Sequence, residues 1–200
     1  MAKSSVKNSK TPPALWRRIL PDPASSFLFI GPCWFPCYDR LVEICHLYIS
    51  PGHNFVGHHE RMPDTYPAIE VASIECVTGR GIRGDRYFDF KEDYKGQITF
   101  FSLEVFEELW AALEVHHRAP GVVRRNVFTR GVDLNSLIGQ DFEIQGIRFY
   151  GTQEAAPCYW MDRAIAPGAK EFLKGRGGLR AKILNDGELY SSARIPVAAG

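Results

Sequence analysis

Cys158 stands in the segment whose residue types are best suited to chemistry. Pro157 restricts the backbone before it, and Tyr159 and Trp160 follow as aromatic side chains that could form the wall of a pocket. A thiolate is both a nucleophile and a soft metal ligand, and cationic neighbours favour that form. Simple packing is the ordinary alternative for a cysteine. The segment therefore indicates a candidate reactive thiol at Cys158.

Three segments rich in arginine and glycine could supply an anion site. Residues 79–84 have the G-x-G-x-x-G pattern, but an aromatic run follows them instead of the helix that a dinucleotide-binding fold requires. They form either a plain turn or a loop whose backbone N–H groups bind an oxyanion. A solvated surface would explain any one segment alone, whereas three in a near-neutral chain favour convergence on an anionic ligand. Guanidinium forks suit phosphate, and the candidate anion-binding residues are Arg80, Arg83, Arg86, Arg124, Arg125, Asn126, Arg130, Arg176 and Arg180.

Histidine and cysteine spacings give weaker indications of a metal site. His53, His58 and His59 share one loop, but no carboxylate or cysteine stands at a matching spacing. Cys33 and Cys37 have no second Cys/His pair at zinc-finger spacing. We therefore expect loop or rim roles for the histidines and no zinc site at the two cysteines.

Composition narrows the class of protein. The chain has 200 residues, 45% of them hydrophobic and 24% charged, so one domain with or without an appendage is expected. Its net charge is +1, and bulk charge therefore gives no case for a nucleic-acid or membrane partner. The odd number of cysteines, with no framework spacing, predicts a reducing compartment, and we expect a cytoplasmic protein. Cys45 and Cys76 lie in apolar runs typical of small core residues. No apolar run approaches the ~18 residues of a membrane-spanning helix.

The periodicity of apolar residues divides the chain into an extension and a domain. Residues 1–40 are rich in Lys, Ser, Asn and Pro and predict a disordered or non-native extension, whereas residues 41–195 have the pattern of a folded domain. Ser102 is a predicted N-cap for a helix over 103–113, and Pro167 to Gly175 predicts a second, short helix. Gln145-Gly146 predicts a two-residue hairpin turn. Strands are expected at 42–50, 69–78, 97–101, 126–129, 142–144, 147–149 and 179–184. This pattern favours a mainly antiparallel barrel or sandwich with a few covering helices.

Several segments, in this order, resemble the MOSC domain, a family named after the C-terminal domain of molybdenum cofactor sulfurases. The likeness covers about residues 42–190 and is closest to small stand-alone bacterial members. It rests on residues 81–86, on 97–100 followed by a helix, and on 124–133, 137–142, 151–158, 175–180 and 185–187. The resemblance implies a mainly β fold, a MOSC-type β-barrel with a few peripheral helices (α+β).

The resemblance also implies a cofactor and a role for Cys158. The ligand would be the molybdenum cofactor (molybdopterin), and the family's cysteine, matched by Cys158, would carry sulfur as a persulfide or contact molybdenum. The chain would then be a sulfur carrier or a molybdenum-dependent oxidoreductase, with a redox or sulfur-donor protein as partner. Several relatives have a second cysteine where this chain has Ala155-Ala156, so no local disulfide relay is implied. The sulfurases' pyridoxal-phosphate domain has no counterpart in 200 residues.

Two other functions stay open at this point. Small members of the family include reductases of N-hydroxylated purines and related compounds, which need a redox partner. A different class would be a non-catalytic anion-binding or nucleic-acid-binding β-barrel, in which arginines contact phosphate and aromatic side chains stack on bases. The near-neutral net charge argues against nucleic acid.

Overall fold

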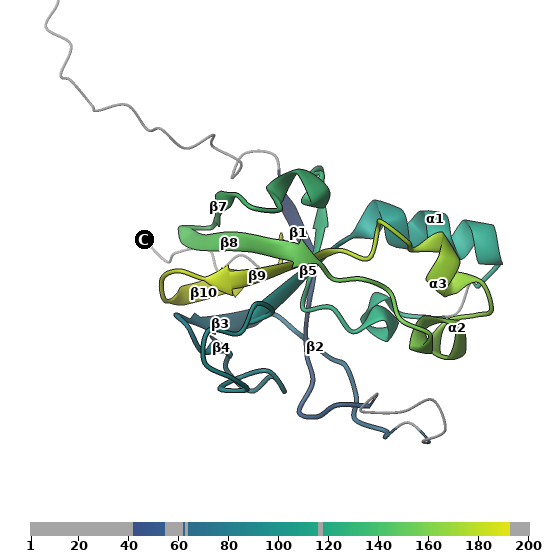
Figure 1. Cartoon of the computed structure of the whole chain (residues 1–200), viewed down its shortest axis with the longest axis horizontal. Coiled ribbons are helices and arrows are strands. Elements are labelled where there is room, and N and C mark those ends of the chain that lie inside the picture. Colours follow the sequence, from purple (N-terminus) through teal and green to yellow (C-terminus); the bar gives the residue numbers. More distant parts are fainter. Residues whose placement is uncertain (1–41, 55–61, 63, 116–117, 193–200) are drawn as a thin grey trace, which may run out of the picture. The chain divides into compact units, whose positions relative to one another are not determined.

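The computed structural model describes residues 42–54, 62, 64–115 and 118–192, and its strands form two sheets (Figure 1). The strands are β1 (Glu43–Ile49), β2 (Ile69–Val71), β3 (Ser73–Val77), β4 (Gly81–Ile82), β5 (Ile98–Ser102), β6 (Val127–Arg130), β7 (Asp141–Ile144), β8 (Ile147–Glu154), β9 (Leu179–Ile183) and β10 (Gly187–Tyr190). The larger sheet has the order β2-β1-β6-β5-β9-β8-β7, and the smaller one has the order β10-β3-β4. The helices are α1 (Leu103–Leu113), α2 (Trp160–Ala164) and α3 (Ala169–Phe172), with 3-10 turns η2 (Pro120–Val123) and η3 (Leu134–Leu137).

The expected closed barrel is wrong, whereas the mainly β character with a few helices is confirmed. Within the described residues neither sheet closes on itself, and β2 and β7 remain as the edges of the larger sheet. The reason lies at Ala72, where the run predicted as one strand divides. β2 pairs with β1, and β3 pairs with β10 in the other sheet. One continuous run thus serves two sheets instead of closing one.

Helix α1 follows its sequence pattern closely. Ser102 caps it, because its hydroxyl accepts a hydrogen bond from the Val105 N–H at 3.1 Å. Leu103, Phe106 and Leu109 form the buried face. The helix connects β5 to β6, which pair in parallel, since a parallel connection requires such a crossover. The other strand pairs in the described residues are antiparallel, as predicted.

The hairpin of β7 and β8 also has its predicted turn. Gln145 and Gly146 both have positive φ, 51° and 78°, as a two-residue hairpin turn requires. The helix predicted from Pro167 is the short α3, and α2 was not predicted. Figure 1 shows α1, α2 and α3 grouped at the same end of the larger sheet.

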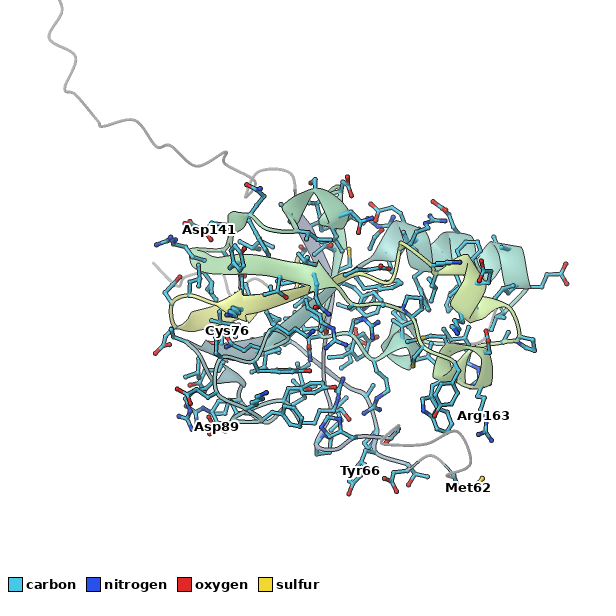
Figure 2. The ribbon with its side chains drawn as sticks, viewed as in Figure 1. Met62, Tyr66, Cys76, Asp89, Asp141 and Arg163 are labelled. Carbon is cyan, nitrogen blue, oxygen red and sulfur yellow. The ribbon has the colours of Figure 1, made fainter. Side chains whose placement is uncertain are left out.

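Two hydrophobic cores lie on opposite faces of the larger sheet. One packs the two sheets together and contains Phe100 and Cys76. Figure 2 shows Cys76 among the strands. The other packs the helices on the sheet and contains Phe101, Phe106 and Phe128. Strand β5 is buried on both faces because its alternate side chains enter different cores. It is therefore a rigid base for the segments at its ends.

Some predictions fall outside the described residues. These are the extension at residues 1–40, the pair Cys33 and Cys37, and the roles of His58 and His59. None of the helices in the described part of the chain has the length and apolarity to cross a membrane.

Candidate functional site

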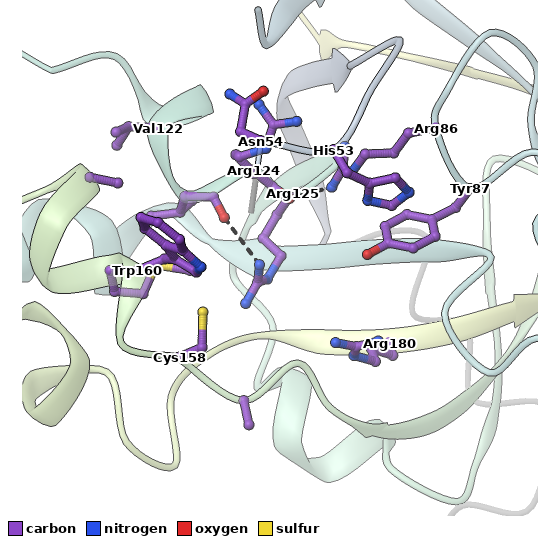
Figure 3. Close-up of a pocket in the computed structure, with 14 residues that line it drawn as sticks. His53, Asn54, Arg86, Tyr87, Val122, Arg124, Arg125, Cys158, Trp160 and Arg180 are labelled. Atoms are coloured by element: carbon purple, nitrogen blue, oxygen red, sulfur yellow. Dashed lines mark hydrogen bonds between the residues drawn. The ribbon is translucent and has the colours of Figure 1, made fainter. Parts of the chain in front are cut away.

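One cavity, of about 240 Å³, brings Cys158 together with four of the predicted arginines (Figure 3). Its lining comes from the segment after β1, the loop after β4, the end of η2 and the two residues after it, the segment before α2, α2 itself, and β9. The lining residues are His53, Asn54, Arg86, Tyr87, Val122, Val123, Arg124, Arg125, Ala156, Cys158, Trp160, Met161, Ala164 and Arg180. Segments far apart in the sequence therefore meet here, as expected for a ligand site.

Arg86 is held by a buried polar cluster next to the cavity. The Asp85 carboxylate lies 3.3 Å from the Arg86 guanidinium, and the exposed fractions of their side chains are 1% and 9%. The same carboxylate accepts hydrogen bonds from the Ser50 N–H at 3.0 Å and the Asn126 side-chain amide at 3.3 Å. The side-chain oxygen of Asn126, Oδ1, accepts from the Thr99 hydroxyl at 2.7 Å. Asn126 was predicted to bind the anion, but it does not line the cavity, and its role is to fix Asp85.

Arg124 is held by neutral acceptors. It has a φ of 54° directly after η2, and it donates to the Ser50 hydroxyl at 2.8 Å and the Gly52 carbonyl at 2.7 Å. Burial lowers the pKa of Arg124 to about 10, and the positive charge of Arg86 acts in the same direction. Arg124 stays cationic at neutral pH, and its charge is not cancelled by a bonded carboxylate among the described residues.

Arg125 is held in the same way. It donates to the backbone carbonyls of Ala155, at 2.6 Å, and Gly177, at 3.1 Å, and a third bond, to Val123, is drawn in Figure 3. Burial lowers its pKa to about 10, with a further lowering from the charge of Arg180. Ala155 lies three residues before Cys158, and Gly177 packs closely against Ala155 and Pro157, so Arg125 also fixes the segment that carries Cys158.

Arg180 completes a surplus of positive charge. Its Nη1 donates to the Tyr94 hydroxyl at 3.1 Å, and its Nε is buried without a hydrogen-bond partner in the described structure. Among the described residues no carboxylate lines the cavity. Of the four arginines in the lining, only Arg86 pairs with a described carboxylate, that of Asp85. Guanidinium groups buried in this way are stabilised by an anion.

Cys158 is a free, exposed thiol at this cavity, and Figure 3 shows its sulfur directed toward Arg125. The other free cysteines in the described residues differ. Burial raises the pKa of Cys76 to about 12 and that of the half-buried Cys45 to about 11. Cys76 is a core residue as predicted, whereas Cys45 only borders a core.

The remaining predicted arginines do not reach the cavity. Each is on the surface and bonds to a carboxylate, which leaves little charge for a ligand. The pairs are Arg80 with Asp89, Arg83 with Glu75, Arg130 with Glu107, and Arg176 with Glu108. Residues 79–84 therefore fit the plain-turn interpretation better than the anion-loop interpretation.

Sequence reasoning found part of the cavity wall. Trp160 lines it as expected and Tyr159 does not, whereas Asn54, Tyr87 and Met161 were not predicted. Tyr87 had a local signal, since it follows Arg86, but nothing in the sequence marked Asn54. His53 lines the cavity, and within the described residues no group of three or more His, Cys, Asp or Glu side chains could hold a metal ion.

Comparisons with known proteins agree with this fold. The family model of the MOSC domain matches residues 85–200. The YuaD protein from Bacillus subtilis has a similar structure, with a TM-score of 0.56 and 21% identity over 75% of this chain and 91% of that one. YiiM from Geobacillus stearothermophilus has a TM-score of 0.52 and 13% identity, over 74% of this chain and 71% of that one. YiiM from Escherichia coli has a TM-score of 0.50 and 15% identity, over 72% of this chain and 66% of that one. At these identities the likeness concerns the fold. No curated protein sequence matches the chain.

Proposed function

The chain belongs to the MOSC domain family, and we propose that its cavity binds the molybdenum cofactor (molybdopterin) by the phosphate group, beside Cys158. The observation that carries this proposal is the surplus of positive charge. Four arginines line the cavity, and in the part of the chain that the structure describes a single carboxylate, that of Asp85, pairs with one of them. An incoming phosphate would offset the cost of burying the other guanidinium groups.

The residues present suit this group. Arg180 has a buried Nε with no acceptor among the described residues, and a phosphate oxygen would supply one. The thiol of Cys158 is a soft ligand of the type that suits molybdenum. When bound, the cofactor would supply a metal centre that changes oxidation state.

The chain's own residues would bind, orient and shield. Arg124, Arg125 and Arg180 would hold the anionic end, and their backbone and tyrosine acceptors fix the direction of each guanidinium group. Trp160 and Met161 would exclude water from the side nearest the thiol.

For Cys158 we propose a direct role, as a molybdenum ligand in an oxidoreductase or as a sulfur carrier. Its exposure supports both roles, because a redox or sulfur-donor protein could reach the thiol. In the carrier role, the thiolate would attack the outer sulfur of a donor persulfide. The new S–S bond would form as the donor's bond breaks, and the donor would leave as a thiolate.

The test is retention of the released cofactor on gel filtration, read by pterin fluorescence and molybdenum content. The wild type should retain about one cofactor per chain, and Arg180→Gln should lose most of it, since a buried donor to the phosphate is removed. Arg83→Gln is the matched control, because that arginine pairs with Glu75 away from the cavity. A wild-type chain that retains no cofactor overturns the proposal.

A further inference from the structure

His53 is a titratable side chain of the cavity wall to which the proposed function gives no role. Figure 3 shows its imidazole beside Arg86 and Tyr87. The ring packs edge-on against Tyr87, with centroids 4.7 Å apart, and it is tilted against Phe90 at 5.8 Å. These contacts fix the imidazole beside the guanidinium groups, within reach of a cavity ligand.

The charged groups around His53 are mainly cationic. Arg86 and Arg124 face it from the loop after β4 and from the end of η2, and the ring of Tyr87 packs against it. Burial lowers the pKa of His53 from its ordinary value, and the charges of Arg86 and Arg124 act in the same direction. Asp85 and a hydrogen bond to the Arg86 backbone act in the opposite direction but do not outweigh them. These effects favour the neutral imidazole in the ligand-free chain.

We propose that His53 is a proton-dependent member of the anion site, which takes up a proton when a doubly charged anion enters the cavity and then adds a positive charge to those of the arginines. The inference rests on the proposed anion site. Its physical basis is that the groups that now oppose protonation are the ones whose charge an anion would offset. The ligand class is an oxyanion with two negative charges, such as a phosphate monoester.

The direction of the pH dependence follows from linkage. An anion favours the imidazolium, so the pKa of His53 is higher in the complex than in the ligand-free chain. Binding is then strongest below the ligand-free pKa, where His53 is already protonated. It weakens as the pH rises through the bound-state pKa, and above that value it depends on the arginines alone.

Sulfate is a suitable probe because it keeps its double charge throughout the range, whereas the second ionisation of a phosphate ester, at about pH 6, would overlap with that of histidine. Histidine NMR titrations with and without saturating sulfate should show the pKa of His53 rising by about one unit, which corresponds to roughly tenfold tighter sulfate binding at pH 5 than at pH 8. Calorimetry at pH 7 in buffers of different ionisation enthalpy should show proton uptake on binding.

Two variants separate the inference from the proposed function. His53→Gln should still bind sulfate but lose most of the pH dependence and the proton uptake. His46→Gln should keep both, because His46 bonds to Glu70 and does not line the cavity. Sulfate binding without a shift at His53 overturns the inference and leaves the anion site standing, and no sulfate binding overturns both. A shift at His53 in a chain that does not retain the molybdenum cofactor leaves the inference standing without the proposed function.

Discussion

The side-chain amide of Asn126 donates a hydrogen bond to the carboxylate of Asp85 across 3.3 Å, and both side chains are buried. Asn126 precedes β6, whereas Asp85 lies in the loop after β4, 41 positions earlier. The other carboxylate oxygen of Asp85 accepts from the Tyr87 N–H at 3.1 Å. The hydrogen bond between Asn126 and Asp85 therefore joins the loop that carries Arg86 and Tyr87 to the larger sheet, and it places both residues at the cavity.

Asp85→Ala should lower the free energy of unfolding by about 3 kcal/mol, because it leaves the Arg86 guanidinium buried without its counter-charge. The measurement is urea denaturation at pH 7. Asp141→Ala is the matched control, since its ion pair with Arg148 is exposed and should contribute at most about 1 kcal/mol. Equal losses in the two variants would show that the buried cluster does not hold the loop.

Local features of the fold could be predicted from the sequence, whereas the division of its strands between two open sheets could not. The cap at Ser102 and the turn at Gln145-Gly146 depend on a few neighbouring residues, so propensity and periodicity determine them. The division of one apolar run at Ala72 between two sheets depends on partners far along the chain. Alternation of apolar residues gives no signal for such a change of sheet.

The sequence predicted all four arginines that line the cavity, and among the described residues only Arg86 has a bonded carboxylate, that of its neighbour Asp85. Arg124, Arg125 and Arg180 reach the cavity as expected. Arg176 does not, because it bonds to Glu108, 68 positions away. Sequence spacing cannot show which arginines are neutralised by distant carboxylates, and so the predicted set was larger than the cavity.

Gly177→Ala should weaken sulfate binding and lower the melting temperature. A Cβ atom at Gly177 would lie 2.5 Å from the Ala155 carbonyl oxygen and 2.9 Å from Pro157 Cδ, so the segment before Cys158 must shift. That shift would disturb both carbonyls that hold Arg125.

Gly146→Ala provides the comparison for this variant. Gly146 has a φ of +78° with nothing within 4 Å of an added Cβ, so the change should cost roughly 1–2 kcal/mol of backbone strain and leave sulfate affinity unchanged. Unaltered sulfate binding by Gly177→Ala, measured by calorimetry, would contradict the role given to the two carbonyls.

Cys76→Ser should lower the free energy of unfolding by about 1–3 kcal/mol, because it puts a hydroxyl into the core between the two sheets. Cys158→Ser should change it by no more than about 0.5 kcal/mol, since Cys158 is exposed. Urea denaturation of both variants checks the difference. A loss in Cys158→Ser as large as that in Cys76→Ser would indicate a packing role for Cys158.

Cys158 should be the first of the described cysteines to react with iodoacetamide at pH 7. Alkylation requires a thiolate, and burial raises the pKa of Cys45 to about 11 and that of Cys76 to about 12. At pH 7 these two thiols are therefore ionised in roughly one molecule in ten thousand or fewer. Their labelling should accelerate about tenfold per pH unit up to those values, whereas Cys158 is exposed and already accessible to the reagent.

Peptide mass spectrometry resolves the sites, and the folded Cys158→Ser chain should have lost cofactor-linked activity or sulfur transfer. If Cys158 labels no faster than Cys45, or if Cys158→Ser keeps full activity, the thiol is not the reacting group and the cavity is an anion-binding site alone.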